Sequence, residues 1–385
     1  MEMIYLDNAS TTFPKPDTVP KAVYDYMTQM GSNINRGGYE SAYSVAETVF
    51  ETRQLLSALF HGGDCKNVVF TKNVTESLNV ILKGFLRPGD HILVSSMEHN
   101  AMMRPIRQLE AIGVEFDRIP CDGTGALKLE SMEGLLRPNT RAVAMLHASN
   151  VCGSVMPIGV VGEFCRDRGL KFIVDCAQTA GVIPINMESM YIDALAFTGH
   201  KGLLGPQGTG GFILREDMIA QIDPLLSGGT GSMSHTEQIP AFMPDRFEPG
   251  TMNLPGILGL KAGLEWLNGT GINQIRRHEL ALTGQLLDGL KPMEERGLLR
   301  IIGPRTCDDR TGVVSIQTLT KELAQAAYEL DADFGIQTRV GLHCAPSAHK
   351  TLGTYPTGTI RFSFGWANTA EQAEKALNAL NEILK

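Results

Sequence analysis

Between residues 66 and 215, short apolar runs alternate with amphipathic stretches of helical length, and this alternation constrains the fold more than any other feature. The apolar runs are 68–70, 91–94, 114–116, 142–146, 171–174 and 194–197. The amphipathic stretches are 75–86, 101–112, 128–136 and 158–168. Apolar strands separated by helices are typical of βαβ units, in which helices cover both faces of a mostly parallel sheet. We therefore expect an α/β fold.

After about residue 258 the pattern changes. Long helices are expected at 259–268 and 273–293, followed by a strand at 312–315, a helix at 321–331, a strand pair near 337–341 and 359–364, and a closing helix at 369–384. This is the pattern of a smaller α+β domain. A chain of 385 residues suits two domains, at roughly 100–200 residues each.

The charge balance excludes some classes of partner. Lysine and arginine number 34 against 42 aspartates and glutamates, a net charge of −8, whereas nucleic-acid-binding proteins usually carry a basic excess. No apolar run reaches the roughly 18 residues that a membrane helix needs. The first residues lack the basic and apolar regions of a signal peptide. We therefore expect a cytoplasmic protein with neither a nucleic acid nor a membrane as partner.

The cysteines argue against disulfides and against a metal site. There are seven, an odd number, and none forms a C-x-x-C pair; they stand at 65, 121, 152, 165, 176, 307 and 344. Reduced thiols are the better interpretation. The group His343, Cys344 and His349 matches no usual zinc-ligand spacing, so no metal is expected.

A lysine on a glycine-flanked turn follows the predicted strand at 194–197, in Thr198-Gly199-His200-Lys201-Gly202. Ligands bind beyond the carboxyl ends of strands in such sheets, and desolvation there lowers the pKa of a lysine and frees its amine as a nucleophile. Asp175 ends another predicted strand. A carboxylate and a lysine placed in this way serve pyridoxal phosphate, the first on the pyridine nitrogen and the second on the aldehyde. The alternatives are a solvated lysine and an aspartate that caps a helix.

Two further segments suit such a cofactor. Thr75 opens a helix directly after a strand, where unpaired N–H groups favour an anion such as a phosphate, and Thr198 and His200 can add donors. His99 also lies between a strand and a helix, and its ring can stack on a pyridine and carry protons. Simple helix capping is the alternative for Thr75, and capping or burial is the alternative for His99.

The last candidate is a cysteine in the smaller domain, in Arg339-Val340-Gly341-Leu342-His343-Cys344-Ala345-Pro346. A loop bounded by glycine and proline, with a histidine adjacent and an arginine upstream, can present a thiolate at a cleft. The alternative is an incidental loop cysteine.

Together these segments resemble the class V branch of fold-type I pyridoxal-phosphate enzymes, and more closely the short-loop group of cysteine desulfurases and selenocysteine lyases. The resemblance runs from Tyr5-Leu6-Asp7-Asn8 to Arg361-Phe362-Ser363. It implies a large cofactor-binding domain at 15–257 with a mostly parallel seven-stranded sheet. It also implies a smaller α+β domain, made of 1–14 and 258–385, that carries the cysteine loop.

The resemblance also implies roles for individual residues. Lys201 bonds to the cofactor, Asp175 and Gln178 contact its ring, and His99 stacks on it. The implied phosphate ligands are Val74, Thr75, Thr198, His200 and Thr251, the last from a second subunit of a homodimer. The implied substrate ligands are Ala9, Arg36, Asn150, Arg339 and Arg361, among which the planar fork of Arg361 suits a carboxylate.

The implied activity is cysteine desulfuration, in which L-cysteine becomes L-alanine and Cys344 carries a persulfide to an acceptor, as in iron–sulfur cluster assembly. Selenocysteine lyase activity, another class V reaction and a non-enzymatic scaffold are the alternatives. Two departures stand out. Leu342 occupies the place of the first histidine in the short-loop pattern, and Asn73-Val74 replaces the usual Gly-Thr before Thr75.

Overall fold

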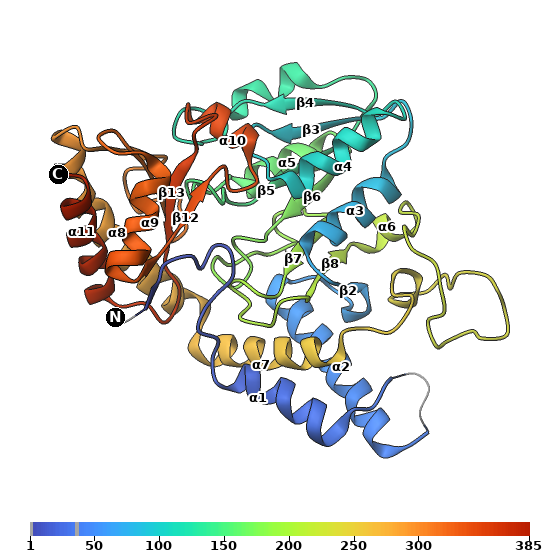
Figure 1. Ribbon diagram of the computed structural model, residues 1–385. Coiled ribbons are helices and arrows are strands. Elements are labelled where there is room, and N and C mark those ends of the chain that lie inside the picture. The colour runs from blue at the N-terminus through green and yellow to red at the C-terminus, as the bar shows by residue number, and fades with distance from the viewer. Residues whose placement is uncertain (1–2, 35–37) are drawn as a thin grey trace.

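The computed structural model describes residues 3–34 and 38–385 (Figure 1). Its centre is a seven-stranded sheet, which confirms the expected α/β fold. In spatial order the strands are β2 (Val68–Thr71), β8 (Gly210–Leu214), β7 (Ala194–Thr198), β6 (Lys171–Asp175), β5 (Thr140–Leu146), β3 (His91–Ser95) and β4 (Glu115–Ile119). The six predicted strands are all present. The sheet is mostly parallel, because only β8 runs against its two neighbours.

Two local expectations differ from the structure. No strand was predicted at β8, because its apolar residues follow a glycine-rich stretch that breaks the pattern. The helix expected at 128–136 is wrong, since only two short 3₁₀ turns form, at Leu129–Ser131 and Glu133–Leu135. Gly134 weakens a helix here, and Pro138 disfavours helical backbone at the residue before it.

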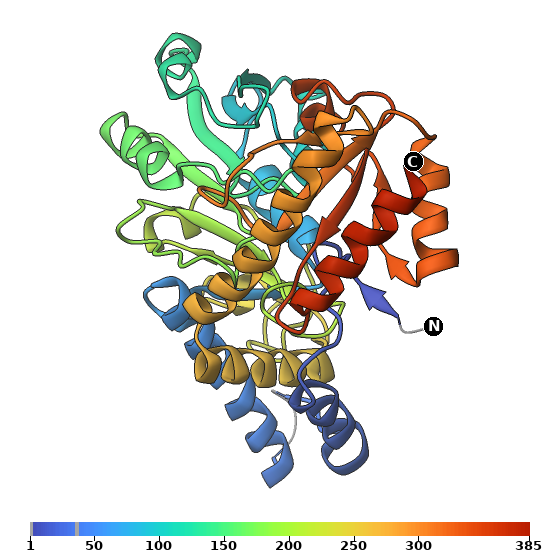
Figure 2. The same cartoon turned by 90° about the vertical axis from the view of Figure 1, so that its left-hand side faces the viewer.

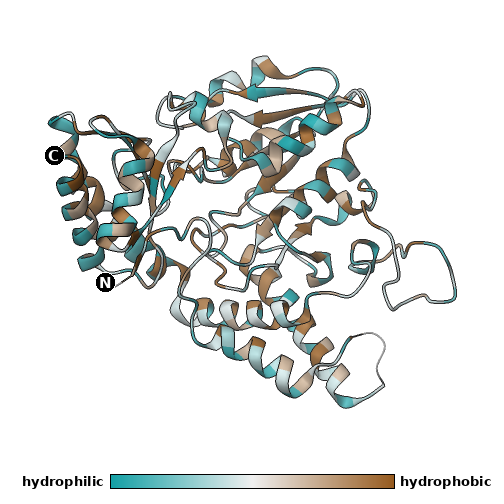
Figure 3. Ribbon diagram, viewed as in Figure 1, coloured by the Kyte–Doolittle hydropathy of each residue, from teal (hydrophilic) through white to brown (hydrophobic). Residues whose placement is uncertain are grey.

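Helices cover both faces of this sheet. Ala142 and Ala144 of β5 belong to the apolar cluster under α3 (Val74–Phe85) and α4 (Asn100–Glu110). Val143 and Met145, on the opposite face, belong to the cluster that includes the remaining covering helices. Those helices are α2 (Glu40–Phe60), α5 (Ile158–Asp167) and α7 (Leu254–Thr270). Burial on both faces explains why the strands are almost continuously apolar (Figure 3).

Other helices surround these layers. The first helix, α1 (Thr18–Asp25), packs on α7, and the short α6 (Glu216–Ile219) follows β8. Within residues 3–34 and 38–385, no helix combines the length and the apolar character needed to cross a membrane.

A second sheet is formed by β12 (Arg339–Gly341), β13 (Thr359–Ser363), β10 (Val313–Thr318) and β9 (Leu299–Ile302), which are antiparallel throughout. It packs with three helices, α8 (Ile272–Glu295), α9 (Leu323–Phe334) and α11 (Ala370–Ile383). Figure 2 shows α8 and α11 side by side. The N-terminal β1 (Ile4–Tyr5) pairs in parallel with β11 (Ile336–Gln337) in a small sheet of its own, so the N-terminal segment joins the C-terminal part of the chain.

Strand register brings the candidate residues of the large sheet together. Asp175 lies opposite Leu146 of β5 and Ala196 of β7. Gly210, at the start of β8, lies opposite both Thr198 and Thr71. The carboxyl ends of β5, β6 and β7 therefore meet the turn that leads from β2 into α3.

Candidate active site

A small cavity of about 40 Å³ lies at these strand ends and is lined by Lys201, Gln178 and Ala9, among others. Lys201 follows β7 on the glycine-flanked turn, and its side chain is partly buried. The Gln178 side-chain amide donates a hydrogen bond to the Ala9 carbonyl at 3.0 Å. This contact joins the turn after β6 to the N-terminal segment, so that three residues expected in the site line one space.

Burial sets the charge state of the lysine. Desolvation lowers the pKa of Lys201 to about 8, with Asp175 opposing that shift and Arg361 adding to it. Asp175 is itself buried, and burial raises its pKa, while a hydrogen bond from the Ala177 N–H and the charge of Lys201 lower it. The amine is thus available as a base or nucleophile near neutral pH.

His99 is the N-cap of α4, as the alternative reading of its sequence position allowed. Its Nδ1 accepts the Ala101 N–H at 3.0 Å. Burial, followed by the charges of Lys201 and Arg104, lowers the pKa of His99 to about 4. The ring is therefore neutral at pH 7 with its proton on Nε2. Capping does not conflict with a stacking role, because only Nδ1 is used by the cap.

Buried hydrogen-bonding groups without partners gather near Lys201. The Thr198 hydroxyl and the Nδ1 of His200 have no partner among the described residues. The start of α3 is close to them, since a Cβ on Gly210 would lie 2.6 Å from the Cα of Asn73. Asn73 caps the helix through the Glu76 N–H, which leaves the N–H groups of the first helical residues, Val74 and Thr75, directed out of the helix end. Such a set suits a phosphate.

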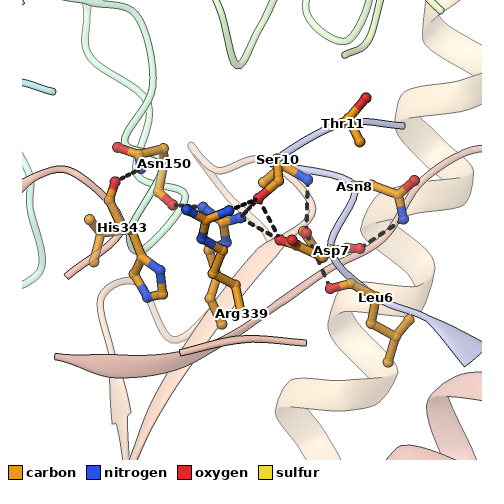
Figure 4. Close-up of polar contacts among 12 residues, drawn as sticks. Leu6, Asp7, Asn8, Ser10, Thr11, Asn150, Arg339 and His343 are labelled. Atoms are coloured by element: carbon orange, nitrogen blue, oxygen red, sulfur yellow. Dashed lines mark hydrogen bonds and ion pairs between the residues drawn. The ribbon is translucent and has the colours of Figure 1, made fainter. Parts of the chain in front are cut away.

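Arg361 projects from β13 and is almost fully buried, with 2% of its surface exposed. It forms an ion pair with Asp7 at 2.6 Å and donates to Ser10 Oγ at 2.8 Å and to the Asn150 carbonyl at 2.9 Å. Arg339 reaches the same Ser10 hydroxyl at 3.2 Å (Figure 4). The Nε of Arg361 and the Oδ1 of Asn150 are buried and have no partner in the described part of the chain.

The Cys344 loop is held against this group. The side-chain amide of Asn150 donates to the His343 carbonyl at 2.8 Å (Figure 4), and the Asn100 N–H, next to His99, donates to the Cys344 carbonyl at 2.8 Å. The thiol of Cys344 is exposed. Both His343 and Cys344 have left-handed backbone, with φ of 47° and 57°.

The His343 side chain is held as well. Its Nε2 lies 2.8 Å from the Thr359 hydroxyl, which donates to Ser315 Oγ at 3.3 Å, and Ser315 Oγ donates to the Val151 carbonyl at 2.5 Å. Burial lowers the pKa of His343 to about 2, so the ring is neutral. The loop thus has ties to β13 as well as to α4.

Two expected residues stand apart. Thr251 is exposed and lines a different cavity of about 260 Å³, together with Lys72 and Glu76 next to the start of α3. Its contribution from a second subunit remains a prediction. Arg36 lies outside the described residues.

Two residues of the site were missed, Asp7 and Ser10. Asp7 was noted only as part of a motif, although a buried arginine needs a carboxylate partner. If the strand that carries Arg361 is taken as buried, this rule indicates a carboxylate partner for that arginine, and this was the signal in the sequence that pointed to Asp7.

The fold and the site together are those of one family of enzymes. The chain belongs to the class-V aminotransferase family, whose model matches residues 4–376. The chain is 31% identical over 384 residues to a probable cysteine desulfurase of Methanothermobacter thermautotrophicus, covering 99% of this chain and 94% of the relative. Among solved structures it is similar to an apo cysteine desulfurase from Thermococcus onnurineus, with a TM-score of 0.92, 32% identity, and 99% and 94% of the two chains covered. A cysteine desulfurase from Escherichia coli gives a TM-score of 0.87 at 29% identity, with the same coverage. These neighbours have the fold of fold-type I enzymes, as expected.

Proposed function

We propose that this protein is a pyridoxal-phosphate-dependent cysteine desulfurase, which converts L-cysteine to L-alanine and takes the sulfur onto Cys344. One observation carries the proposal beyond family membership. Cys344 is exposed, its carbonyl accepts the N–H of Asn100, the residue after His99, and the preceding carbonyl of His343 accepts from the Asn150 amide. His99 in turn feels the charge of Lys201, a lysine whose pKa is lowered. A transaminase needs the lysine alone, whereas sulfur transfer needs both groups. The names of the relatives agree with this assignment.

The described residues fit the cofactor. Lys201 offers a free amine to its aldehyde, and Asp175 offers a buried carboxylate to its ring nitrogen. Gln178 and His99 lie beside these two, and the unpartnered donors of Thr198 and His200, with the first N–H groups of α3, suit its phosphate. When bound, pyridoxal phosphate supplies an electron-withdrawing ring that stabilises negative charge at the substrate's carbon atoms.

The chain's own groups then divide the work. Arg361 has an unpartnered Nε–H to offer the substrate carboxylate, and Asn150 an unpartnered Oδ1 to offer its amine. Lys201 moves the α-proton as a base of pKa about 8. Cys344, as a thiolate, attacks the substrate sulfur. An S–S bond forms as the C–S bond breaks, the electron pair stays on carbon, and that carbon gains a proton to give alanine.

The remaining elements of the proposal concern assembly. We propose a homodimer in which Thr251 completes the phosphate site of the second copy, supported by the exposed apolar side chains of Leu225 and Leu226, which line the same cavity as Thr251. We also propose that 15–257 and the two segments 1–14 and 258–385 form separate domains, supported by the β1–β11 pairing. The persulfide passes to an acceptor in the cytoplasm.

The test is Cys344→Ser, with Cys307→Ser as the matched control because Cys307 is partly exposed but remote from these residues. Protein loaded with pyridoxal phosphate is incubated with L-cysteine and dithiothreitol, and alanine and sulfide are quantified. Cys344→Ser should reduce sulfide to the level without protein while leaving the cofactor absorbance unchanged, and the control should match the parent. Equal sulfide from Cys344→Ser and the parent would contradict the proposal.

A further inference from the structure

A second cavity lies beside the Cys344 loop, between α4 and the short helix α10 (Pro346–Thr351). It measures about 430 Å³ and shares no residue with the cavity at Lys201. Four basic side chains line it, from three elements in the upper part of Figure 1: Arg104 and Arg107 of α4, Arg118 of β4, and Lys350 of α10. Because the whole chain carries a net charge of −8, this gathering of cations does not follow from a general basic excess.

Few carboxylates neutralise these cations. Arg107 forms an exposed ion pair with Glu110 at 2.7 Å. Within residues 3–34 and 38–385, Arg104, Arg118 and Lys350 have no carboxylate partner within salt-bridge distance. Among the described residues that line the cavity, Glu98 is the one acidic residue. It is fully buried, its oxygens accept from the Ser95 hydroxyl and the Leu146 N–H, and burial raises its pKa to about 8, so its protonated form predominates at pH 7.

Packing holds two of these like charges together. The guanidinium groups of Arg107 and Arg118 lie 4.7 Å and 4.9 Å from the ring centroid of the same side chain, Phe116. The Nε of Arg118 is buried and lacks a hydrogen-bond partner among the described residues. The two guanidinium groups repel each other, and Glu110, paired with Arg107, opposes that repulsion at Arg118 less than Arg107 creates it. The buried Nε–H of Arg118 is therefore left for a negative ligand.

We infer that this cavity binds a small oxyanion carrying at least two negative charges. Guanidinium forks pair with the oxygens of phosphates and carboxylates in two parallel hydrogen bonds. Among the described residues, Arg104, Arg118 and Lys350 have no carboxylate partner, although Arg118 and Lys350 lie over the rings of Phe116 and Tyr355. A monovalent anion would leave most of the charge uncompensated. This inference does not depend on the proposed activity, because none of the four basic residues belongs to the candidate active site.

An anion bound in the cavity should change the reactivity of the Cys344 thiol. Asn100 lines the cavity, and its N–H donates to the Cys344 carbonyl. Pro346 and Ser347, the first residues of α10, line it from the other side. A bound anion therefore places negative charge beside the segments that hold the Cys344 backbone, and negative charge disfavours the anionic form in which a cysteine reacts.

The direct test is calorimetric titration of inorganic pyrophosphate into protein saturated with pyridoxal phosphate, which blocks the phosphate site near Thr198. We expect saturable binding of one pyrophosphate per chain. The double variant Arg104→Gln/Lys350→Gln should weaken it by about tenfold or more. The control Arg166→Gln/Lys291→Gln removes the same charge from exposed positions elsewhere and should leave the affinity within about twofold of the parent's, a change of under 0.5 kcal/mol.

A second measurement reports on Cys344 without using turnover. The rate at which neutral iodoacetamide alkylates Cys344, followed by mass spectrometry of its peptide, should fall when pyrophosphate saturates the parent. It should not change in the Arg104→Gln/Lys350→Gln variant. The inference is overturned if the parent shows no saturable binding, if both double variants bind alike, or if acetate binds as tightly as pyrophosphate. Loss of turnover in Cys344→Ser with normal pyrophosphate binding would support both conclusions separately.

Discussion

The two reactive side chains of this protein, Lys201 and Cys344, occupy opposite environments. Lys201 lies at the strand ends of a sheet that is buried on both faces, and burial is what lowers its pKa. Cys344 is exposed, and what positions it is its backbone, bonded to Asn100 and placed next to a residue bonded to Asn150. The protein therefore prepares one nucleophile by desolvation and the other by fixing the chain that carries it.

This difference has an energetic side. Left-handed backbone at non-glycine residues costs on the order of 1 kcal/mol or more each, and His343 and Cys344 adopt it in succession. The hydrogen bonds to Asn100, Asn150 and Thr359 offset that cost. Changes at Lys201 should thus act on chemistry, and changes around Cys344 should act on the geometry and stability of the loop.

The largest expected effect is at Lys201. Lys201→Ala removes the proposed base and the amine that bonds the cofactor, so turnover of L-cysteine should fall by roughly 10³-fold or more. Covalent attachment, detected by borohydride reduction and peptide mass, should be lost.

Lys15 provides a matched control, because its pKa is also lowered to about 8 by burial while its amine donates to the His200 carbonyl at 2.6 Å. Lys15→Ala should cost less than about tenfold, as loss of one hydrogen bond does. Equal impairment of the two variants would contradict the assignment of Lys201 as the lysine that bonds the cofactor.

The second prediction concerns pH. A lysine of pKa about 8 is mostly charged at pH 7 and mostly neutral at pH 9, so its free-amine fraction rises about tenfold over that range and then levels off. The rate at which cofactor-free protein captures pyridoxal phosphate, followed by absorbance, should have that profile. A lysine at its ordinary pKa would show a rise that continues beyond pH 10.

The variant Asp175→Asn tests the direction in which Asp175 shifts the pKa of Lys201. The Asp175 carboxylate favours the charged amine, so its removal should move the midpoint to lower pH. A midpoint that moved upward would show that the two groups are not coupled as the structure indicates.

The smallest expected effect is on the loop. Thr359→Val removes the partner of His343 Nε2 and leaves a buried N–H without an acceptor, which should cost about 1–3 kcal/mol of unfolding free energy. Sulfide production should fall by less than tenfold, while capture of pyridoxal phosphate by Lys201 stays unchanged. Urea denaturation measures the first quantity.

Thr306→Val is the control for this change, because in the described part of the chain the exposed Thr306 hydroxyl contacts only Asp308, at 3.3 Å. Its effect on stability should stay within about 0.5 kcal/mol. Similar losses in the two variants would contradict the role assigned to Thr359.

Much of this molecule could be predicted from local sequence pattern. The six predicted strands of the large sheet and the closing helix could be predicted, because the spacing of their apolar residues is that of a buried strand or of an amphipathic helix. β8 and β9 were not predicted, since glycines precede both and shorten the pattern. The strand-end rule placed Asp175 and Lys201 in a ligand crevice from sequence alone.

The partners of Arg361 could not be found in the same way. Asp7 meets it only because the N-terminal segment runs beside β13, where Asp7 forms a bridge to Ser363. That contact joins residues more than 350 positions apart, and no local pattern encodes it. The basic cavity beside the Cys344 loop is similar, since its four cations come from three separate elements.

One carbonyl group, that of Val151, decides which tautomer the imidazole next to Cys344 adopts. A carbonyl can only accept, so Ser315 must give its proton to it. Thr359 then gives its own to Ser315, and the remaining lone pair of Thr359 has to be met by an Nε2–H of His343. The Nδ1 of His343 is thereby left bare and able only to accept, so nitrogen-15 NMR should report a neutral Nε2–H ring throughout the physiological pH range.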